Sequence, residues 1–324
     1  ATLSSERGAR RWQARLAAPP AATEAVEQMH ALIGRALTEA HAGWPAPHQP
    51  PVAIGVAVAG QVDTARGLVR QVRLASGWED FPLARALAER WGGPAVILTT
   101  TQAATLAEAR LGAGRGRQQV IYLWLGRSVA AGLLLHGTLY LGAHGAAGNL
   151  AHWQARPDGP RCSCGARGHL EPITSAQSLV RTMIGRAVDA PASEAAMLRI
   201  TGGRAEAMTA EQVARLAAEG DPVAVGVVGE ALDALAPALA NLAVALDPDV
   251  IVLGGPLAGA AAGFVAPLGA RVAALCQPFM AAPPVHAGEL DPVAALVGAV
   301  LAARAAEQTA AAACGAGASG EGCS

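Results

Sequence analysis

The feature that most limits how this chain can fold is an alternation of short uncharged strands with helices. Residues 52–59 and 95–98 are apolar runs without charge, which is typical of strands covered on both faces. Residues 81–91 and 101–111 have the pattern of helices, the first opening with Phe-Pro and ending before a Gly-Gly pair. The order strand, helix, strand, helix predicts an α/β layered domain.

A second set of elements follows with the same character. A turn at His136-Gly137 should separate two strands from a third, and a long helix, kinked near Pro237, should lead into a buried strand. The strands are expected at residues 120–125, 129–135, 139–141 and 250–253, the helices at residues 23–40, 221–246 and 292–307, and a turn at residues 60–63. The tail at residues 308–324 has low complexity and is expected to be disordered.

Composition and charge exclude several classes of function. The chain has 324 residues, 52% hydrophobic and 15% charged, which predicts a globular protein of about two domains. A formal net charge of -1 provides no long-range field for polyanions, which argues against generic binding to nucleic acids or membrane surfaces. The chain contains no lysine, so Schiff-base chemistry and a Walker-type phosphate lysine are excluded. A basic cluster around Trp12 is interpreted as a solvated face; it consists of Arg7, Arg10, Arg11 and Arg15.

Three observations predict a cytoplasmic protein. The most apolar stretch, residues 250–270, is rich in glycine and proline and fits strand, turn and helix better than a membrane span. No basic segment followed by an apolar core opens the chain, so no signal peptide is expected. The five cysteines suit a reducing compartment, since Cys162 and Cys164 are too close in sequence for a relaxed disulfide.

The glycine-rich segment at residues 142–173 is too long for a simple connector and concentrates histidine and cysteine. It contains two imidazoles and two thiols, the donor set of a four-coordinate structural zinc site. The candidate ligands are His152, Cys162, Cys164 and His169, with His144 left out as a spare. The alternative is that the cysteines are free surface thiols and the histidines are incidental.

Five motifs, in this order and spacing, resemble those of the ROK proteins, a family of bacterial repressors and sugar kinases. They are Gly-Trp-Glu-Asp-Phe-Pro-Leu at residues 77–83, Leu-Ala-Glu-Ala-Arg-Leu-Gly-Ala-Gly-Arg-Gly at residues 106–116, Gly-Ala-His-Gly-Ala-Ala-Gly at residues 142–148, the Cys-Ser-Cys-Gly segment within residues 158–171, and Asp-Pro-Asp-Val-Ile-Val-Leu-Gly-Gly at residues 247–255.

The resemblance spans about residues 1–303 and implies an actin-like, ribonuclease H-like sugar-kinase fold with two α/β domains around a cleft. It would divide the chain into an N-terminal α/β domain, residues 1–113, joined by the helix at residues 292–307, and a larger α/β domain, residues 114–291, carrying the zinc loop. The family's first strand, with an Asp-x-Gly-Gly-Thr phosphate motif, has no counterpart, because the chain begins just after its expected position.

The resemblance also implies a zinc site of the pattern His followed by CxCGxxGC. His169 replaces the last cysteine, and histidine is also a zinc ligand. The family's glutamate after this motif is retained as Glu171, which the resemblance makes a ligand of sugar hydroxyls. The alternative for Glu171 is a plain surface carboxylate.

The catalytic base of the family is missing from this chain. Family kinases carry Asn-Asp at the end of the strand before the alanine-rich helix, and the matching residues here are Thr99 and Thr100. A threonine hydroxyl is not a general base near neutral pH, and losing such a base costs about 100- to 10,000-fold in rate. No carboxylate lies between Glu89 and Glu108 to replace it.

The nucleotide side is changed as well. Where family kinases have a Gly-Thr-Gly-Ile-Gly-type hairpin, this chain has Gly126-Arg127-Ser128-Val129-Ala130, so side chains occupy the approach of the phosphates. Gly254-Gly255 resembles the turn that contacts adenosine, but a simple strand–helix turn explains it equally well. Binding of ATP and magnesium is therefore doubtful.

The sugar side is partly altered. The glutamate of the family's Gly-Glu-Ile-Gly-His segment is Asn149, and the family's asparagine before the Gly-Trp motif has no counterpart. Asn149 and Glu171 can still hydrogen-bond hydroxyls. The candidate sugar ligands are Glu171, Asn149, His152, Thr99 and Thr100.

These departures favour a catalytically inactive, sugar-sensing regulatory protein stabilised by zinc. An active ATP-dependent sugar kinase with a displaced base is the main alternative, and a structural or partner subunit that binds no ligand is a third. Family regulators carry a helix-turn-helix domain before the sugar-binding part, so DNA binding would require sequence upstream of these residues. A homodimer is the family-level expectation, and the sequence does not name the sugar.

Overall fold

The chain divides into two compact α/β units. The computed structural model describes residues 2–4, 10–13, 21–39, 53–72, 75–277 and 279–317. Unit 1 comprises Ala1–Ala107, Leu141–Ala146 and Val293–Ser324, and unit 2 comprises Glu108–Tyr140 and Ala147–Pro292. Arg7 and Arg15 of the basic cluster lie outside the described residues, as do the side chains of its other two members.

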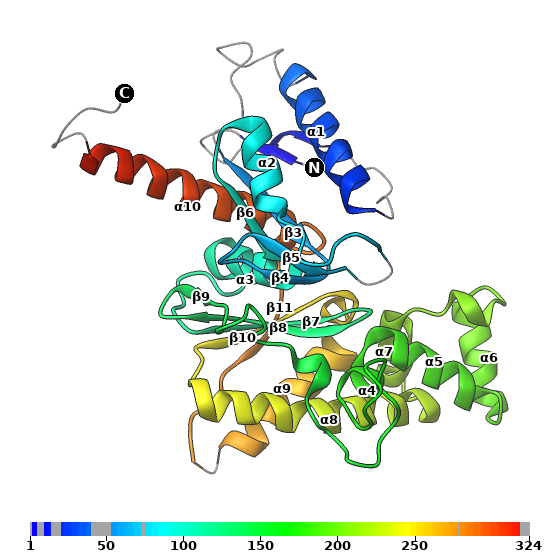
Figure 1. Ribbon diagram of the computed structural model, residues 1–324. Coiled ribbons are helices and arrows are strands. Elements are labelled where there is room, and N and C mark those ends of the chain that lie inside the picture. Colours follow the sequence, from blue (N-terminus) through cyan, green and yellow to red (C-terminus); the bar gives the residue numbers. More distant parts are fainter. Residues whose placement is uncertain are drawn as a thin grey trace. The chain divides into compact units, whose positions relative to one another are not determined.

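Unit 1 is built on a parallel pair of strands joined by a helical crossover (Figure 1). The pair is β3 (Ile54–Val58) with β6 (Ala95–Thr99); two antiparallel pairs are β1 (Thr2–Ser4) with β2 (Arg10–Gln13) and β4 (Gln61–Asp63) with β5 (Leu68–Gln71). The prediction of a turn at residues 60–63 was wrong, because residues 61–63 form strand β4. Val62 of β4 is buried and pairs with Val69 of β5. The crossover helix α2 (Leu83–Trp91) ends at Gly92, whose left-handed conformation lets its N–H reach the carbonyl of Ala88.

The other helices of unit 1 are α1 (Ala22–Glu39), most of α3 (Thr100–Leu111) and α10 (Ala294–Gly317). Helix α10 packs closely on β3 and α3 because a glycine lies at each contact. Gly55 of β3 lies against the backbone of Ala299 in α10, and Gly298 of α10 lies against the backbone of Ala103 in α3. A Cβ at either glycine would collide with a carbonyl oxygen. Helix α10 continues to Gly317, so residues 308–317 are helical and not disordered; their alanine-rich sequence has high helix propensity.

Unit 2 contains a five-stranded sheet of order β11-β10-β7-β8-β9. The strands are β7 (Val120–Leu125), β8 (Val129–Leu135), β9 (Thr138–Tyr140), β10 (Val250–Gly254) and β11 (Val285–Ala287), with β7, β8 and β9 antiparallel and β10 parallel to both β7 and β11. Alternate residues of β7, such as Ile121 and Leu123, belong to the large hydrophobic core that also includes the buried side of helix α8.

Helices pack against this core (Figure 1). They are α4 (Glu171–Thr174), α5 (Ala176–Ala187), α6 (Pro191–Ile200), α7 (Ala210–Ala218), α8 (Pro222–Leu246) and α9 (Ala266–Cys276). Asp221 caps α8 by accepting a hydrogen bond from the N–H of Ala224 at 2.9 Å. The sequence analysis did not assign α5, α6 and α7, although Thr209-x-x-Gln212 at the start of α7 is the capping-box pattern.

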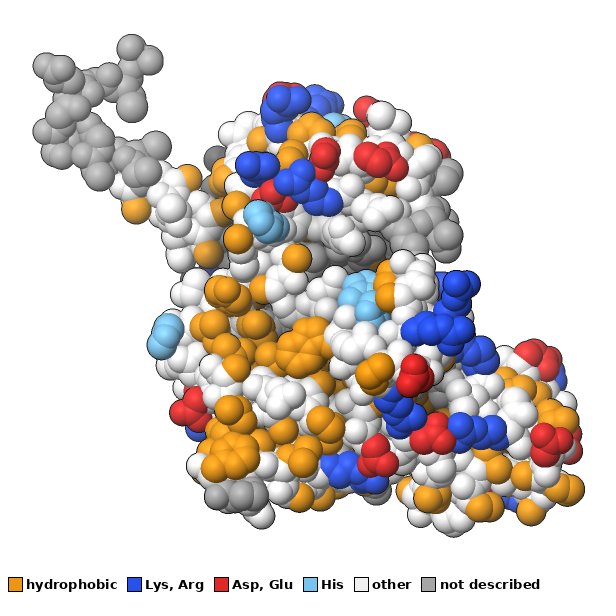
Figure 2. Space-filling view, turned by 60° about the horizontal axis from the view of Figure 1, so that its bottom comes forward, with side chains coloured by type: hydrophobic (Ala, Val, Ile, Leu, Met, Phe, Trp, Pro, Cys, Tyr) orange, Lys and Arg blue, Asp and Glu red, His pale blue; other side chains and the backbone are white. Residues whose placement is uncertain are grey.

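Helix α8 is long and apolar enough to cross a membrane by length and composition alone. In this structure 61% of its most apolar window is buried within the protein, as expected of a core helix. On the face drawn in Figure 2, basic and acidic side chains are interspersed. This mixed surface agrees with the near-zero net charge.

Candidate functional site

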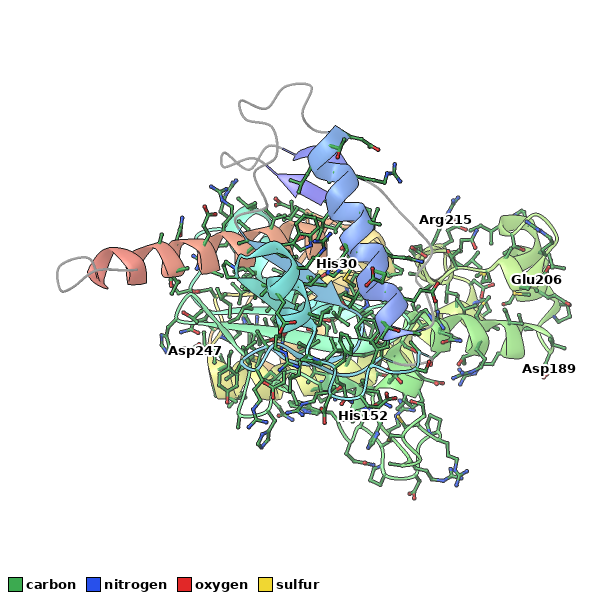
Figure 3. All side chains as sticks on the ribbon, turned by 45° about the horizontal axis from the view of Figure 1, so that its top comes forward. His30, His152, Asp189, Glu206, Arg215 and Asp247 are labelled. Carbon is green, nitrogen blue, oxygen red and sulfur yellow. The ribbon has the colours of Figure 1, made fainter. Side chains whose placement is uncertain are left out.

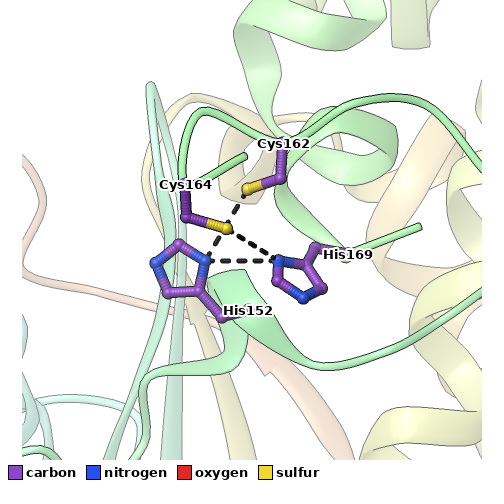
Figure 4. Close-up of side chains that lie close together, drawn as sticks. All are labelled: His152, Cys162, Cys164 and His169. Carbon is purple, nitrogen blue, oxygen red and sulfur yellow. Dashed lines mark hydrogen bonds between the residues drawn. The ribbon is translucent and has the colours of Figure 1, made fainter. Parts of the chain in front are cut away.

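All four predicted metal ligands come together in unit 2. His152, Cys162, Cys164 and His169 offer donor atoms that lie within 4.8 Å of one another (Figure 4). The facing histidine atoms are both Nδ1, 3.4 Å apart. Cys164 Sγ lies 3.4 Å from Nδ1 of His169, and Cys162 Sγ lies 3.6 Å from Nδ1 of His152.

Three of the donor separations match those of one tetrahedral ion. Zinc bonds of about 2.0–2.1 Å to nitrogen and about 2.3 Å to sulfur place tetrahedral donors roughly 3.3–3.8 Å apart. The His152–His169, Cys162–His152 and Cys164–His169 distances fall in that interval. Two thiols and two imidazoles are also the soft and borderline donors that zinc prefers, so the residues present fit the metal that the sequence predicts.

Two buried leucines hold the ends of the metal loop in place. Leu150 and Leu170 belong to the core of unit 2, and each lies within two residues of a histidine ligand. Leu150 is in the 3-10 turn Leu150–His152, and the N–H of Leu170 donates to the carbonyl of Trp153 at 3.0 Å. Figure 3 labels His152 on this part of unit 2. The core thus sets the positions of both imidazoles.

Between these ends, glycines shape the loop around the thiols. Gly165 has a φ of +96° in the turn between the cysteines and His169, and its N–H donates to the carbonyl of Cys162 at 3.0 Å. Gly168 has a φ of +72° and lies against the carbonyl of Arg156, where a Cβ would collide. Only glycine combines this backbone conformation with this close approach.

Glu171, the expected sugar ligand, begins helix α4 directly after the metal loop. Its side chain is half-buried, and its Oε1 accepts a hydrogen bond from Ser163 Oγ at 3.4 Å. Ser178 Oγ donates to the carbonyl of Glu171 at 3.3 Å, which fixes the α4–α5 junction. The Glu171 side chain is therefore only partly covered by the protein.

The other predicted ligands of unit 2 lie on its turns. Asn149 is exposed, next to Gly148, whose carbonyl accepts the N–H of Ala131 in β8 at 2.7 Å. Gly126 lies in the β7–β8 turn, and its carbonyl accepts the N–H of Ala176 at the start of α5 at 2.9 Å. Gly254 ends β10 and Gly255 follows it.

Thr99 and Thr100 lie in unit 1, where β6 passes into α3. Thr99 Oγ1 accepts the N–H of Gln102 at 3.1 Å, and Gln102 Oε1 accepts the N–H of Thr99 at 2.9 Å. This reciprocal pair is a capping box. Thr64 Oγ1 also donates to Gln102 Oε1, at 3.3 Å. The position that carries a base in family kinases is here a neutral hydrogen-bonded helix start.

Sequence reasoning missed Gln102, which caps the start of α3 together with Thr99. This residue could have been found, because Thr-x-x-Gln is the capping-box pattern.

Comparison with known proteins identifies the family. A family model described as the ROK family matches residues 14–306. The chain belongs to the ROK family. Its two α/β units have the actin-like ATPase fold of ROK sugar kinases.

Relatives in the ROK family include both kinases and repressors. The glucokinase of Thermotoga maritima is 29% identical over 246 residues, covering 76% of this chain and 75% of that protein. The DNA-binding transcriptional repressor Mlc of Escherichia coli is 29% identical over 216 residues, covering 64% of this chain and 49% of the repressor.

A solved ROK structure matches nearly the whole chain. The ROK family glucokinase from Streptomyces griseus, in complex with glucose and AMPPNP, superposes with a TM-score of 0.76 and is 29% identical. The match covers 93% of this chain and 94% of that one. The fold is therefore shared with a glucokinase whose structure contains both a sugar and a nucleotide analogue.

Proposed function

We propose that this ROK protein is a zinc-stabilised sugar sensor of the transcriptional-regulator type, with a kinase site that no longer catalyses phosphoryl transfer. The observation that carries the proposal is the start of α3, where Thr99 and Gln102 form a neutral helix cap and Thr100 is the first helical residue. Without a carboxylate there, no group accepts the proton of an attacking sugar hydroxyl, at a cost of about 100- to 10,000-fold in rate.

The next carboxylate along α3 does not substitute for the lost base. Glu108 is fully buried and accepts hydrogen bonds from the backbone N–H groups of Ala113, Glu289 and Leu290 at 2.8–3.2 Å. A buried carboxylate bonded to three backbone N–H groups acts as a structural clamp between segments of the chain. It supports the proposal by leaving the helix without a free base.

The sugar is proposed to bind through Glu171, Asn149, His152, Thr99 and Thr100. Zinc on His152, Cys162, Cys164 and His169 would hold Glu171 in place, because the loop between the ligands leads directly into α4. In this proposal zinc is structural and does no chemistry. Residues 1–113 with the C-terminal helix, and residues 114–291, are the two proposed functional domains, acting as a cytoplasmic homodimer. DNA would be a partner only through a helix-turn-helix domain upstream of these residues.

An ATP-dependent sugar kinase is the second candidate. It is favoured by the glucokinase relatives, at 29–31% identity, and by the similarity to a glucokinase complexed with glucose and AMPPNP. Under this alternative a hexose or N-acetylhexosamine would be phosphorylated with a displaced base.

The deciding experiment is a thermal-shift screen against hexoses, N-acetylhexosamines and their phosphates, with and without magnesium ATP, alongside an assay for ADP release. The proposal expects one sugar to raise the melting temperature by mass action, without ADP release. Glu171→Ala should abolish the shift, whereas Glu206→Ala, at an exposed site on another part of unit 2, should preserve it. Sugar-dependent ADP release that is lost in Glu171→Ala would replace the proposal with the kinase.

A further inference from the structure

Two glycine turns of unit 2 match the motifs that resemble the nucleotide side of ROK kinases, Gly126 between β7 and β8 and Gly254-Gly255 after β10, and each contacts one of the chain's own side chains. At the end of β10, the N–H of Gly255 donates to Asp291 Oδ2 at 2.7 Å. A phosphate oxygen makes the same kind of contact with a backbone N–H. The carboxylate therefore occupies a donor that an anionic ligand at this turn would need.

The preceding glycine is covered by Tyr122. The β7–β10 register pairs Tyr122 with Val252 and Trp124 with Gly254, so both aromatic residues lie on the same face of the sheet as Gly254. The Tyr122 hydroxyl lies where a Cβ of Gly254 would be. Tyr122 is fully buried, and its hydroxyl has no hydrogen-bond partner among the described residues.

The β7–β8 turn is covered in the same way by Trp124. Its indole Nε1 lies 2.5 Å from the position that a Cβ of Gly126 would take, so the ring rests directly on the glycine. Trp124 is half-buried and occupies space beside the turn where a phosphate-binding hairpin needs open backbone.

The electrostatics of this face also oppose an anion. Burial, together with the charges of Asp291 and Glu108, raises the pKa of Tyr122 far above its ordinary value of 10. Both carboxylates therefore act on the space around the Tyr122 hydroxyl. A phosphate entering here would meet two negative charges in a region of low dielectric constant.

We propose that Asp291, Tyr122 and Trp124 fill the nucleotide subsite of this ROK protein and exclude ATP, with Asp291 taking the place of a phosphate at the Gly255 N–H. This inference rests on the proposed function and deepens it. A sugar can be bound without a nucleotide, because the Asp291 carboxylate already accepts the hydrogen bond of the Gly255 N–H.

The test is equilibrium binding of magnesium AMPPNP, by calorimetry, to the full chain and to two variants. Asp291→Asn keeps an acceptor oxygen for the Gly255 N–H and removes only the charge. Asp291→Asn combined with Trp124→Thr also opens the β7–β8 turn. We expect no saturable binding by the unmodified chain at millimolar concentration, and at least about a tenfold gain in affinity, or about 1.4 kcal/mol, in the variants.

The matched control is Asp249→Asn at the other end of β10. Asp249 Oδ2 also accepts hydrogen bonds from backbone N–H groups, those of Gln118 and Gln119, at 2.9 Å. The Asp249→Asn substitution should leave AMPPNP binding unchanged. Tight binding by the unmodified chain would overturn the inference, as would a folded Asp291→Asn protein with no gain. If the double variant does not fold, Asp291→Asn alone decides.

The two proposals fail in different ways. Sugar-dependent ADP release, or no sugar binding at all, would overturn the sensor. AMPPNP binding without ADP release would overturn only the exclusion of nucleotide.

Discussion

At the scale of single residues, this ROK protein departs from the kinase motifs that it resembles through substitutions that keep the local structure. Thr99 and Gln102 form a helix cap where the resemblance places a base, and His169 stands where it places a cysteine. The first replacement caps a helix, and the second keeps a donor atom of the kind that binds zinc.

Removing one of the four candidate ligands tests the assignment of the metal site directly. Cys164→Ser should reduce bound zinc to well below one ion per chain and lower the melting temperature, because the remaining thiolate loses its partner. Metal analysis of the freshly purified protein with calorimetry would show both effects. Ser163→Ala, at the exposed position between the cysteines, is the control and should retain zinc. Full zinc content in Cys164→Ser would refute the ligand assignment.

At the scale of elements, the metal loop depends on backbone shape as much as on its ligands. Gly165 and Gly168 both have positive φ, but only Gly168 faces a carbonyl, that of Arg156. This difference allows the cost of backbone strain to be measured separately from the cost of a steric collision.

Alanine at each glycine provides a matched pair. Gly165→Ala should cost about 1 kcal/mol of unfolding free energy, from the left-handed conformation alone. Gly168→Ala should cost more and also reduce zinc content, because the added Cβ would displace the Arg156 carbonyl and the loop beside His169. Denaturant unfolding with metal analysis measures both. Equal losses in the two variants would mean that the collision is relieved without cost.

The link between α5 and α8 predicts a dependence on pH. Arg186 makes a bidentate contact with Glu230 at 2.8 and 2.9 Å, and this hydrogen bond lowers the pKa of Glu230 from its ordinary 4.5. A lowered carboxylate pKa stabilises the fold above the unfolded pKa, and that stability is lost as pH falls through the folded value. Because both side chains are over a third exposed, the loss is under about 1 kcal/mol.

Arg186→Ala measures this contribution. Its unfolding free energy should fall below that of the unmodified chain at pH 7, and the two should converge as the pH drops below 4.5. Arg199→Ala in α6 is the control, because Arg199 is exposed and forms no ion pair within the described part of the chain. A difference that stays constant down to acid pH would assign the effect to packing of the arginine stem instead.

At the scale of the whole molecule, all four metal ligands and the α4–α5 junction belong to unit 2. Loss of zinc should therefore loosen one unit and spare the other. Chelation followed by amide hydrogen exchange should speed exchange around residues 150–176 and leave β3 and β6 of unit 1 unchanged. Cys164→Ser should not respond to the chelator. Faster exchange in both units would show that zinc stabilises the molecule globally.

The sequence by itself predicted the α/β class, the strands β7 and β8 to the residue, and four candidate metal ligands that lie together in the structure. These features are local, because an uncharged apolar run indicates a buried strand and four soft donors in one loop have few ways to be arranged. That Thr99 and Thr100 replace a base stays a prediction, which needs only residue identity. The helices α5, α6 and α7 were not assigned, although α7 begins with the capping box of Thr209 and Gln212.

Only the tertiary structure decided what lies at the two glycine turns. Asp291 meets Gly255, and Tyr122 meets Gly254, across more than thirty residues of intervening chain in each case. The register of β7 against β10 places Tyr122 and Trp124 on the face that carries the turns. Side-chain contact between distant segments depends on register and packing, which no local pattern in the sequence encodes.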